Sequence, residues 1–194
     1  MHNHAIEPGL LEEFNEHNRA RLLRIIRERS FIRGQFTLSS GEQSDHFFDL
    51  KRTMLDPEGS NLIAEMILNI TRDHKAVAVG GLGFGALPIA STVCAKSFGR
   101  QALNAFYIRK EAKDHGTRRL IEGNIEAGTH VILLDDVMTT GATLLDAVNV
   151  IRSFGCTVDT AITVIDRESQ NRMTDALRAA NLTVISLFRR SEFG

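Results

Sequence analysis

The stretch Val131-Ile-Leu-Leu-Asp-Asp-Val-Met-Thr-Thr-Gly-Ala-Thr143 decides the fold expected of this chain. It begins with four apolar residues, two of them β-branched, which predicts a buried parallel strand. Two adjacent carboxylates, Asp135 and Asp136, close the strand, and a loop of small and hydroxyl residues leads into a helical pattern. Ligands of open α/β sheets bind at the carboxyl ends of strands, where such loops lie. We therefore predict a binding site at the end of this strand.

The residue types in this stretch indicate which ligand it binds. Hydroxyls, backbone N–H groups and a helix N-terminus together favour a phosphate. Two carboxylates would repel that phosphate, unless they hold sugar hydroxyls or a hydrated cation between themselves and it. The stretch therefore predicts a sugar-phosphate site. The alternative is an ordinary strand–turn–helix in which the acids cap the turn.

The composition narrows the class of protein. Lys and Arg number 23 against 24 Asp and Glu, a net charge of −1, which argues against a protein that mainly coats nucleic acid. Cys94 and Cys156 lack metal-site spacing, so we expect buried thiols in a reducing compartment. No apolar run approaches the ~20 residues of a membrane span. We therefore expect a soluble, cytoplasmic protein that does not bind a membrane.

Strand and helix patterns alternate along most of the chain. An amphipathic helix, or two with a break near residues 17–18, is expected over 8–29, and a hairpin-like segment follows. We then expect strands at about 75–80, 102–108, 129–135, 158–165 and 182–188, with helices at about 57–73, 89–97, 143–154 and 171–180. This alternation predicts one α/β domain with a doubly wound parallel sheet of about five strands. Its core spans about 57–188.

Four other segments permit a functional or a structural interpretation. The glycines of residues 80–88 form either a second anion loop or a plain turn. The cations of residues 109–123 lie on a solvated loop or on a lid that closes over a polyphosphate. Arg167 makes a surface ion pair or binds an anionic substrate. Of Phe47 and Phe48, either one faces the core and the other is partly exposed, or both form a flat wall for a planar ring.

The quoted stretch resembles the phosphoribosyl-pyrophosphate (PRPP) signature of type I phosphoribosyltransferases. Three further segments narrow the resemblance to the orotate phosphoribosyltransferase family. Residues 109–117 resemble its catalytic loop, and residues 36–41 with Phe47 and Phe48 resemble its N-terminal hood. Asp166 and Arg167 match its orotate-contacting Asp-Arg pair. The resemblance, from about residue 31 to about 168, implies the type I phosphoribosyltransferase fold, with a hood of residues 31–51 plus the N-terminal helix.

The resemblance also implies a reaction: orotate and PRPP give orotidine 5′-monophosphate and pyrophosphate, in pyrimidine (UMP) synthesis. Mg²⁺ would bind mainly to PRPP, reaching Asp135 and Asp136 through water. A homodimer is implied, with the loop 109–119 shared across subunits. The implied catalytic residues are Lys110, Lys113, His115, Asp135 and Asp136. The implied PRPP-binding residues are Arg109, Lys110, Lys113, His115, Asp135, Asp136, Val137, Met138, Thr139, Thr140, Gly141, Ala142 and Thr143. The implied orotate-binding residues are Phe47, Phe48, Thr139 and Arg167.

The chain departs from the family pattern at two lysines. Many members have Lys where this chain has Ser39, and many have a Tyr-Lys-Gly sequence where it has Phe84-Gly85-Ala86. We expect both departures to affect the affinity for PRPP more than the class of reaction. Two alternatives remain: a phosphoribosyltransferase for another base, and a PRPP-sensing regulator that uses the basic loop on nucleic acid. The net charge and the intact acidic pair argue against the regulator.

Overall fold

The central feature of the computed structural model is a six-stranded sheet with the order β5-β4-β3-β6-β7-β8. The structure describes residues 8–37, 41, 43–110, 120–170 and 172–194, and side chains from residue 16 onward within them. Five of the six strands run parallel, whereas β5 pairs antiparallel with β4 at one edge. The strands are β3 (Ala78–Leu82), β4 (Asn104–Ile108), β5 (Ile121–Gly123), β6 (His130–Met138), β7 (Thr157–Asp166) and β8 (Thr183–Arg189).

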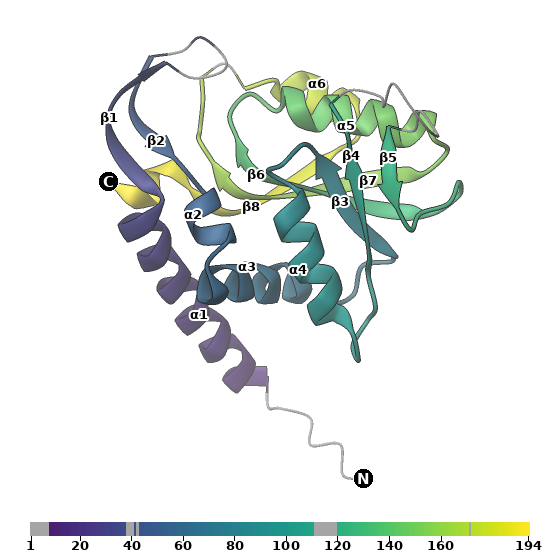
Figure 1. Cartoon of the computed structure of the whole chain (residues 1–194), viewed down its shortest axis with the longest axis horizontal. Coiled ribbons are helices and arrows are strands. Elements are labelled where there is room, and N and C mark those ends of the chain that lie inside the picture. Colours follow the sequence, from purple (N-terminus) through teal and green to yellow (C-terminus); the bar gives the residue numbers. More distant parts are fainter. Residues whose placement is uncertain (1–7, 38–40, 42, 111–119, 171) are drawn as a thin grey trace.

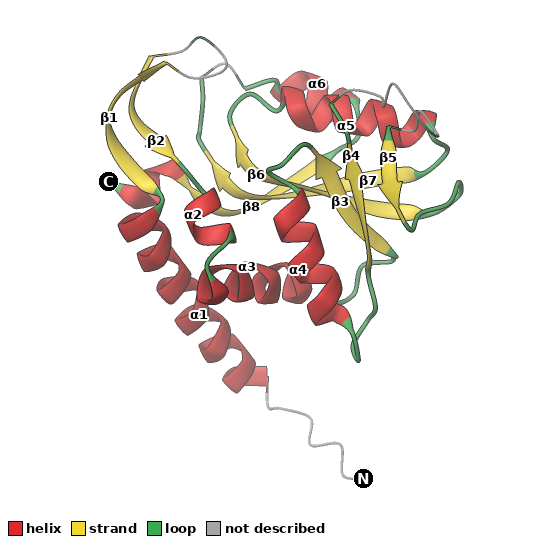
Figure 2. Cartoon of the chain, in the orientation of Figure 1, coloured by secondary structure: helices red, strands yellow, loops and turns green. Residues whose placement is uncertain are grey.

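Helices cover both faces of this sheet (Figures 1 and 2). One face carries α3 and α4, with α1 beyond them, and the other carries α5 and α6. On β6, Ile132 and Leu134 join the first core while Val131 and Leu133 join the second, as the two-residue period of a strand dictates. The helices are α1 (Pro8–Arg29), α2 (Lys51–Met54), α3 (Pro57–Ile70), α4 (Leu87–Ser97), α5 (Ala142–Ser153) and α6 (Thr174–Ala179).

The strand order reverses between β3 and β6. From β3 the chain continues outward through β4 to β5, and it then returns to place β6 on the other side of β3. The loops that follow two such strands turn toward opposite faces of the sheet and leave a crevice between them. Open α/β sheets bind ligands in this crevice. The Gly-rich loop after β3 and the Thr/Gly loop after β6 therefore border it from its two sides.

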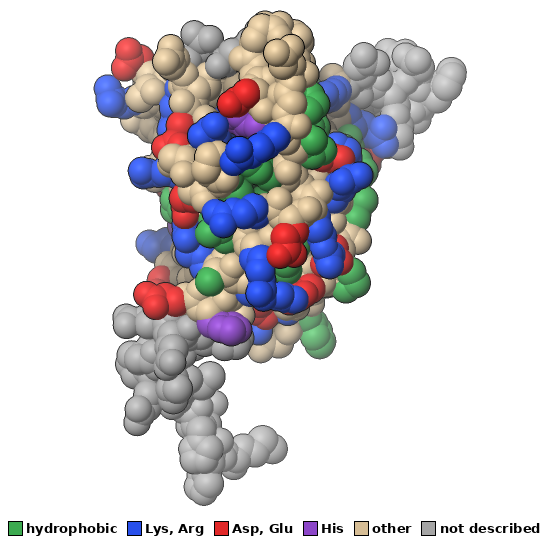
Figure 3. Space-filling model, turned by 90° about the vertical axis from the view of Figure 1, so that its left-hand side faces the viewer, with side chains coloured by type: hydrophobic (Ala, Val, Ile, Leu, Met, Phe, Trp, Pro, Cys, Tyr) green, Lys and Arg blue, Asp and Glu red, His purple; other side chains and the backbone are tan. Residues whose placement is uncertain are grey.

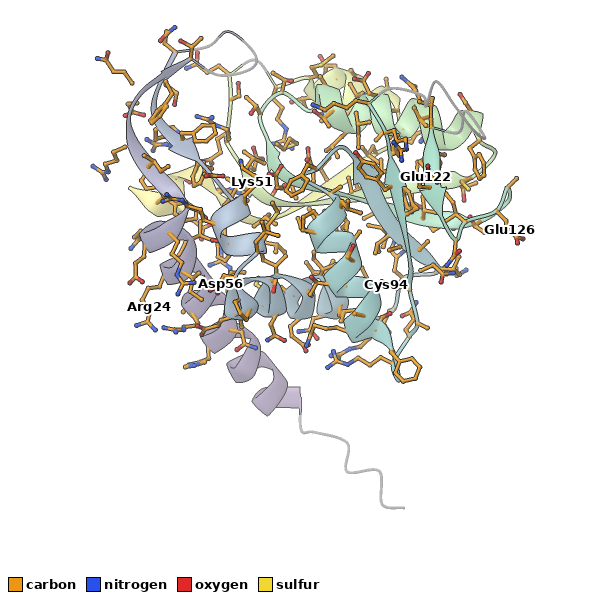
Figure 4. The ribbon with its side chains drawn as sticks, viewed as in Figure 1. Arg24, Lys51, Asp56, Cys94, Glu122 and Glu126 are labelled. Carbon is orange, nitrogen blue, oxygen red and sulfur yellow. The ribbon has the colours of Figure 1, made fainter. Side chains whose placement is uncertain are left out.

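Local sequence signals explain where helices begin and end. Asp56 is the N-cap of α3, because its Oδ1 accepts hydrogen bonds from the N–H groups of Glu58 (3.1 Å) and Gly59 (2.9 Å). Figure 4 labels Asp56 at this end of α3. Pro57 occupies the first helical position, where its missing N–H costs nothing. Gly155, in the left-handed region at φ 93°, follows the end of α5.

A two-stranded hairpin, the hood, stands apart from the sheet. It pairs β1 (Phe31–Thr37) with β2 (Gln43–Phe48) in antiparallel fashion. The C-terminal 3₁₀ turn, Arg190–Phe193, lies against it (Figure 1). The Phe193 ring is buried, with its centroid 5.7 Å from that of Phe31 and 5.1 Å from that of Phe48. The end of the chain therefore fixes the hood to β8.

The structure corrects several expected boundaries. Helix α1 is one helix through residues 17–18, without the break that the sequence allowed. The segment 109–123 was expected to lack structure, but its end forms β5. Helix α2 was not expected, α3 ends at Ile70 and α6 begins only at Thr174. Both cysteines are free thiols, yet only Cys156 is fully buried.

Surface charges are mixed on the side of α1 and the hood. Figure 3 shows Lys and Arg side chains interspersed with acidic ones there. Several are paired, such as Arg21 with Glu58 and Arg19 with Glu192, both at 2.5 Å. None of the helices that the structure describes is both long and apolar enough to cross a membrane.

Candidate active site

The loop between β6 and α5 surrounds a small cavity. Gly141 is the N-cap of α5 at φ 92°, a conformation that favours glycine, and it has no side chain to cap the first turn. The loop is anchored because the N–H of Met173 donates to the carbonyl of Thr140 at 2.8 Å. The cavity measures about 220 Å³. It is lined by Asp135, Val137, Met138, Thr139, Thr140, Gly141, Ala142 and Thr143.

The acidic pair lies at the mouth of this loop. Asp135 is buried, with 7% of its surface exposed, while Asp136 is half-buried. The Asp135 Oδ1 accepts from the N–H of Asp136 (3.0 Å), and the Asp136 Oδ1 accepts from the N–H of Val137 (2.8 Å). Burial, and then the neighbouring Asp136 carboxylate, raise the pKa of Asp135 well above its usual range. A nearby cation or polarised hydroxyl groups would offset the free-energy cost of ionising Asp135 in this buried position.

The Gly-rich loop after β3 approaches these carboxylates closely. A Cβ atom on Gly85 would lie 2.4 Å from the Asp136 Oδ1 and 3.2 Å from the Asp135 Oδ1. A side chain at position 85 would have to displace the Asp136 carboxylate from its present place, so glycine allows this loop to approach the acidic pair closely. Gly83, Phe84 and Gly85 of this loop also line the cavity that the acidic pair borders.

A larger cavity of about 770 Å³ is also lined by Asp135, Asp136 and Thr143. Two of the cationic side chains predicted for the site lie on it. Arg109 and Lys110 both border it, at the end of β4. The Arg109 Nε donates to the Glu122 Oε1 at 3.1 Å, so β5 holds this guanidinium at the edge of the cavity; Figure 4 labels Glu122. Lys110 is exposed. Lys113 and His115 lie outside the described residues.

A third cavity, of about 480 Å³, separates the hood from the end of β7. Thr139 and Arg167 line it, so the structure brings together two of the predicted orotate contacts. The Arg167 Nη2 donates to the Ser44 Oγ (2.9 Å) and to the His46 Nε2 (3.0 Å). His46 is buried, and its Nδ1 lies 2.6 Å from the Asp45 Oδ1. We assign the Nδ1–H tautomer to His46, because its Nε2 then accepts from Arg167.

Ser44 and His46 were missed by the sequence analysis. Their only sequence signal is the alternation within β2, which turns Ser44, His46 and Phe48 to the less exposed face. Nothing in that alternation indicates Arg167 as their partner. Asp166, in contrast to Arg167, is buried and accepts from the Arg172 Nη1 (2.6 Å) and the N–H of Glu168 (2.9 Å). It thereby holds the loop that carries Arg167.

Of the two interpretations of the phenylalanine pair, the structure agrees with the one that places one ring in the core and leaves the other partly exposed. The Phe48 ring is 5% exposed and packs within the hood core, 5.1 Å from the ring of Phe31. Phe47 is more exposed, and its ring lies 5.6 Å from that of Phe36. The physical reason is the period of the strand: adjacent residues point to opposite faces, so the two rings cannot form one surface.

Comparison with known proteins identifies relatives over most of the chain. Residues 53–185 match the model of the phosphoribosyl transferase domain. The orotate phosphoribosyltransferases of Rhodopseudomonas palustris and Bradyrhizobium diazoefficiens are each 42% identical to this chain over 181 residues, covering 91% of it and 96% of the relative.

Solved structures agree with these relatives. A Corynebacterium diphtheriae phosphoribosyltransferase superposes with a TM-score of 0.79 at 33% identity, covering 92% of this chain and 99% of the other. The Mycobacterium tuberculosis orotate phosphoribosyltransferase in complex with PRPP superposes with a TM-score of 0.74 at 31% identity, covering 91% and 99%. The residues that match the family model, 53–185, include strands β3 to β7 and the acidic pair.

Proposed function

The chain belongs to the orotate phosphoribosyltransferase family, and from this premise we propose that it transfers the phosphoribosyl group of PRPP to orotate, giving orotidine 5′-monophosphate and pyrophosphate. This is a step of pyrimidine synthesis. The observation that carries the assignment is the way the three cavities share residues. Thr139 lines both the cavity between the hood and β7 (the hood cavity) and the small cavity inside the loop between β6 and α5 (the loop cavity). Asp135, Val137 and Thr143 line both the loop cavity and the large cavity.

This order of cavities matches the parts of the reactants. The loop cavity, rich in hydroxyls and helix N–H groups, suits the 5′-phosphate. The hood cavity, with the guanidinium of Arg167, suits orotate, whose carboxylate pairs with a cation. The large cavity, bordered by Arg109 and Lys110, suits the pyrophosphate. We assign Lys113 and His115 to pyrophosphate as well, on the family resemblance.

Catalysis then rests on position and charge. Breaking the bond between C1′ of the ribose and pyrophosphate builds positive charge on the ribose and negative charge on the departing group. Asp135 and Asp136 would hold the ribose hydroxyls and, when ionised, stabilise the positive charge. The cations from 109 onward would stabilise the departing pyrophosphate. No covalent nucleophile is needed, because holding both substrates in line supplies much of the barrier reduction.

The acidic pair also fits magnesium. Carboxylate oxygens are ligands that Mg²⁺ prefers, and glycine at position 85 leaves the Asp136 carboxylate room at the cavity. We propose that Asp135 and Asp136 would hold Mg²⁺, bound mainly to PRPP, through water, and the ion would supply charge neutralisation for the phosphates. We also propose a cytoplasmic homodimer in which the loop 109–119 contributes to the partner's site, as the family resemblance implies.

The assay that tests the function follows orotate consumption with PRPP and Mg²⁺. We expect turnover by the wild type and a loss of most of it in Lys110→Ala, which borders the large cavity without packing in a core. Arg167→Ala should raise the KM for orotate by roughly 10- to 100-fold, the value of a charge-assisted hydrogen bond. Exposed Lys51, labelled in Figure 4, gives a matched control as Lys51→Ala. Unchanged kinetics in Lys110→Ala would contradict the role of this lysine.

The same assay separates the two alternatives. An enzyme for another base would consume PRPP with a neutral base and retain that activity in Arg167→Ala. A nucleic-acid-binding regulator would show no turnover and a salt-sensitive gel shift. The buried carboxylate pair favours neither alternative.

A further inference from the structure

A second cluster of side chains that can bind a metal lies at the other end of the central strands, where β6 and β7 begin. His74 belongs to the connection between α3 and β3, His130 is the first residue of β6, and Asp159 lies near the start of β7. One nitrogen or oxygen from each lies within 4.8 Å of the others. His130 and Asp136 occupy the same strand six residues apart, so the cluster is roughly 20 Å from the acidic pair. The proposed reaction does not use it.

The distances in this cluster suit a small metal ion. The Asp159 Oδ1 is 3.4 Å from the His130 Nε2 and 3.7 Å from the His74 Nε2. Ligand atoms about 2.0–2.2 Å from a tetrahedral zinc are roughly 3.3–3.6 Å from one another. Two of the three pairs are therefore almost at the required spacing. The imidazole rings are nearly parallel, at 17° with centroids 5.3 Å apart, so their edges face the same carboxylate.

The hydrogen bonds of His130 leave one nitrogen facing Asp159. The Thr157 Oγ1 donates to the carbonyl of Thr129 (3.4 Å) and therefore accepts from the His130 Nδ1–H (2.9 Å). In the neutral ring, Nε2 then directs a lone pair at the Asp159 carboxylate, and two acceptors face one another. A cation between them satisfies both. A hydrogen bond that orients the second imidazole nitrogen is characteristic of metal-ligating histidines.

His74 is the weaker ligand of the three. Its Nδ1 accepts from the N–H of Ala76 (3.3 Å), and its Nε2 lies 3.2 Å from the Thr160 Oγ1. Because that hydroxyl donates to the Asp159 Oδ1 (2.8 Å), the proton of His74 is on Nε2. Binding a metal at Nε2 moves the proton to Nδ1 and ends the long contact with Ala76.

An irregularity in the sheet places Asp159 in the cluster. The register of β6 against β7 shifts by one residue between His130–Thr157 and Ile132–Thr160, so β7 contains one extra residue at this point. Bulges are rare in parallel pairs, and they often redirect a side chain at a functional position. The bulge contains Asp159, between Thr157 and Thr160.

We propose that His74, His130 and Asp159 bind a divalent transition metal of the zinc class, with water in the remaining positions. Two imidazoles and one carboxylate form a donor set that suits such ions, whereas Mg²⁺ prefers oxygen ligands. The metal connects the segment before β3 to β6 and β7, in addition to the backbone hydrogen bond from Val77 to His130 and the side-chain contact of His74 with Thr160. Its effect is therefore on the stability of the sheet, separate from the transfer reaction.

The test is titration of metal-free protein with Zn²⁺ by calorimetry, and with Co²⁺ by absorption, in excess Mg²⁺. His2 and His4, which lie outside the described residues, are replaced by Ala in the background to remove a competing site. We expect one equivalent per chain and a rise in Tm of roughly 5–10 °C at a hundred times Kd. His130→Ala and Asp159→Asn should abolish both effects, and His74→Ala should weaken binding by roughly tenfold.

The exposed His17, on α1 and outside the cluster, supplies the matched control: His17→Ala should bind as the background protein does. Folding of each variant is checked without metal by far-UV circular dichroism and by orotate turnover, which should stay at the background level. Zinc binding of equal stoichiometry and affinity in Asp159→Asn and His130→Ala would overturn the proposal. So would the absence of binding, or of a cobalt spectrum with nitrogen ligands, in the background protein.

Discussion

At the scale of single residues, Asp135 is buried, although the proposed reaction requires its carboxyl group to be ionised. The raised pKa means that the folded protein holds this proton more tightly than the unfolded chain does. Stability therefore falls as the pH rises from the ordinary range of Asp, about 3.9, through the raised value, and the cost persists at higher pH. In the proposed reaction the ionised pair binds the sugar and a hydrated cation, and their binding would offset this cost.

Replacing Asp135 should separate stability from activity. We expect Asp135→Asn to raise the free energy of unfolding by about 1–2 kcal/mol at pH 8 and by less at pH 4, because an amide bears no buried charge. Turnover should fall by about 100-fold or more. Urea denaturation at the two pH values, with the orotate assay, measures both. An Asn variant that is less stable than the wild type at pH 8 would refute this account.

The second residue-scale prediction concerns His46, which accepts a hydrogen bond from Arg167 and borders Asp45. The His46 Nδ1–H donates to the Asp45 Oδ1 (2.6 Å), and this second bond holds the pKa of Asp45 below its usual range. We expect His46→Phe to raise the KM for orotate by roughly five- to tenfold, since the Arg167 guanidinium loses an acceptor that orients it. His46→Gln, which keeps an acceptor, should recover part of the loss. A KM for PRPP that rises as much as that for orotate would instead indicate a general loss of hood structure.

The residues around the β6 loop could be predicted because they are contiguous in sequence, and their types alone indicate a phosphate and a sugar. Ser44 and His46 could not, because 123 and 121 residues separate them from Arg167. Their contact depends on how the hood sits over the sheet. Periodicity along one strand carries no information on that packing.

At the scale of elements, the long strands were predictable and the short ones were not. Strands β6 and β7, of nine and ten residues, are buried along most of their length, and their apolar residues predict them. Strand β5 has three residues and exists because β4 offers it an edge to pair with. Helix α2, of four residues, depends likewise on packing against α3. Elements whose stability comes from a neighbour leave little trace in their own sequence.

Glu65 joins two helices on one face of the sheet. From α3 it accepts hydrogen bonds from Arg100 at 2.9 and 3.2 Å and pairs with Lys96 of α4 at 2.8 Å. These partners, Arg100 first, hold the pKa of Glu65 below its usual range. Its contribution to stability is therefore complete above the ordinary Glu value of about 4.3 and is lost as the pH falls through the lowered folded value.

We expect Glu65→Gln to lower the free energy of unfolding by about 0.5–1 kcal/mol at pH 7, because these cations are partly exposed to solvent. The difference from wild type should shrink as the pH falls below the ordinary Glu value of about 4.3. Thermal unfolding across a range of pH values measures it. Exposed Glu126, labelled in Figure 4, supplies the control, and Glu126→Gln should differ little from wild type at any pH. A Glu65 effect that does not shrink as the pH falls would show that shape, rather than charge, is lost.

At the scale of the whole molecule, the proposed homodimer predicts complementation between inactive variants. Lys113→Ala removes a loop cation and Asp135→Asn disables the strand end, so each alone should be nearly inactive. If the loop serves the partner's site, a co-expressed mixture contains hybrid dimers with one intact site. Activity should then return to about a quarter of the wild-type value, as random pairing gives. A mixture no more active than its components would place the loop over its own subunit's site.

The turn formed by Arg190–Phe193 joins the hood to the rest of the molecule. Phe193 fits among the rings of Phe31, Phe48 and Phe188, while Glu192 binds Arg19. A nonsense codon at position 190 would spare the acidic pair, the phosphate loop and Arg167. The truncated product would nevertheless lose the packing that keeps Ser44 and His46 beside that arginine. A genetic screen would then score as loss-of-function an allele whose reaction chemistry is intact.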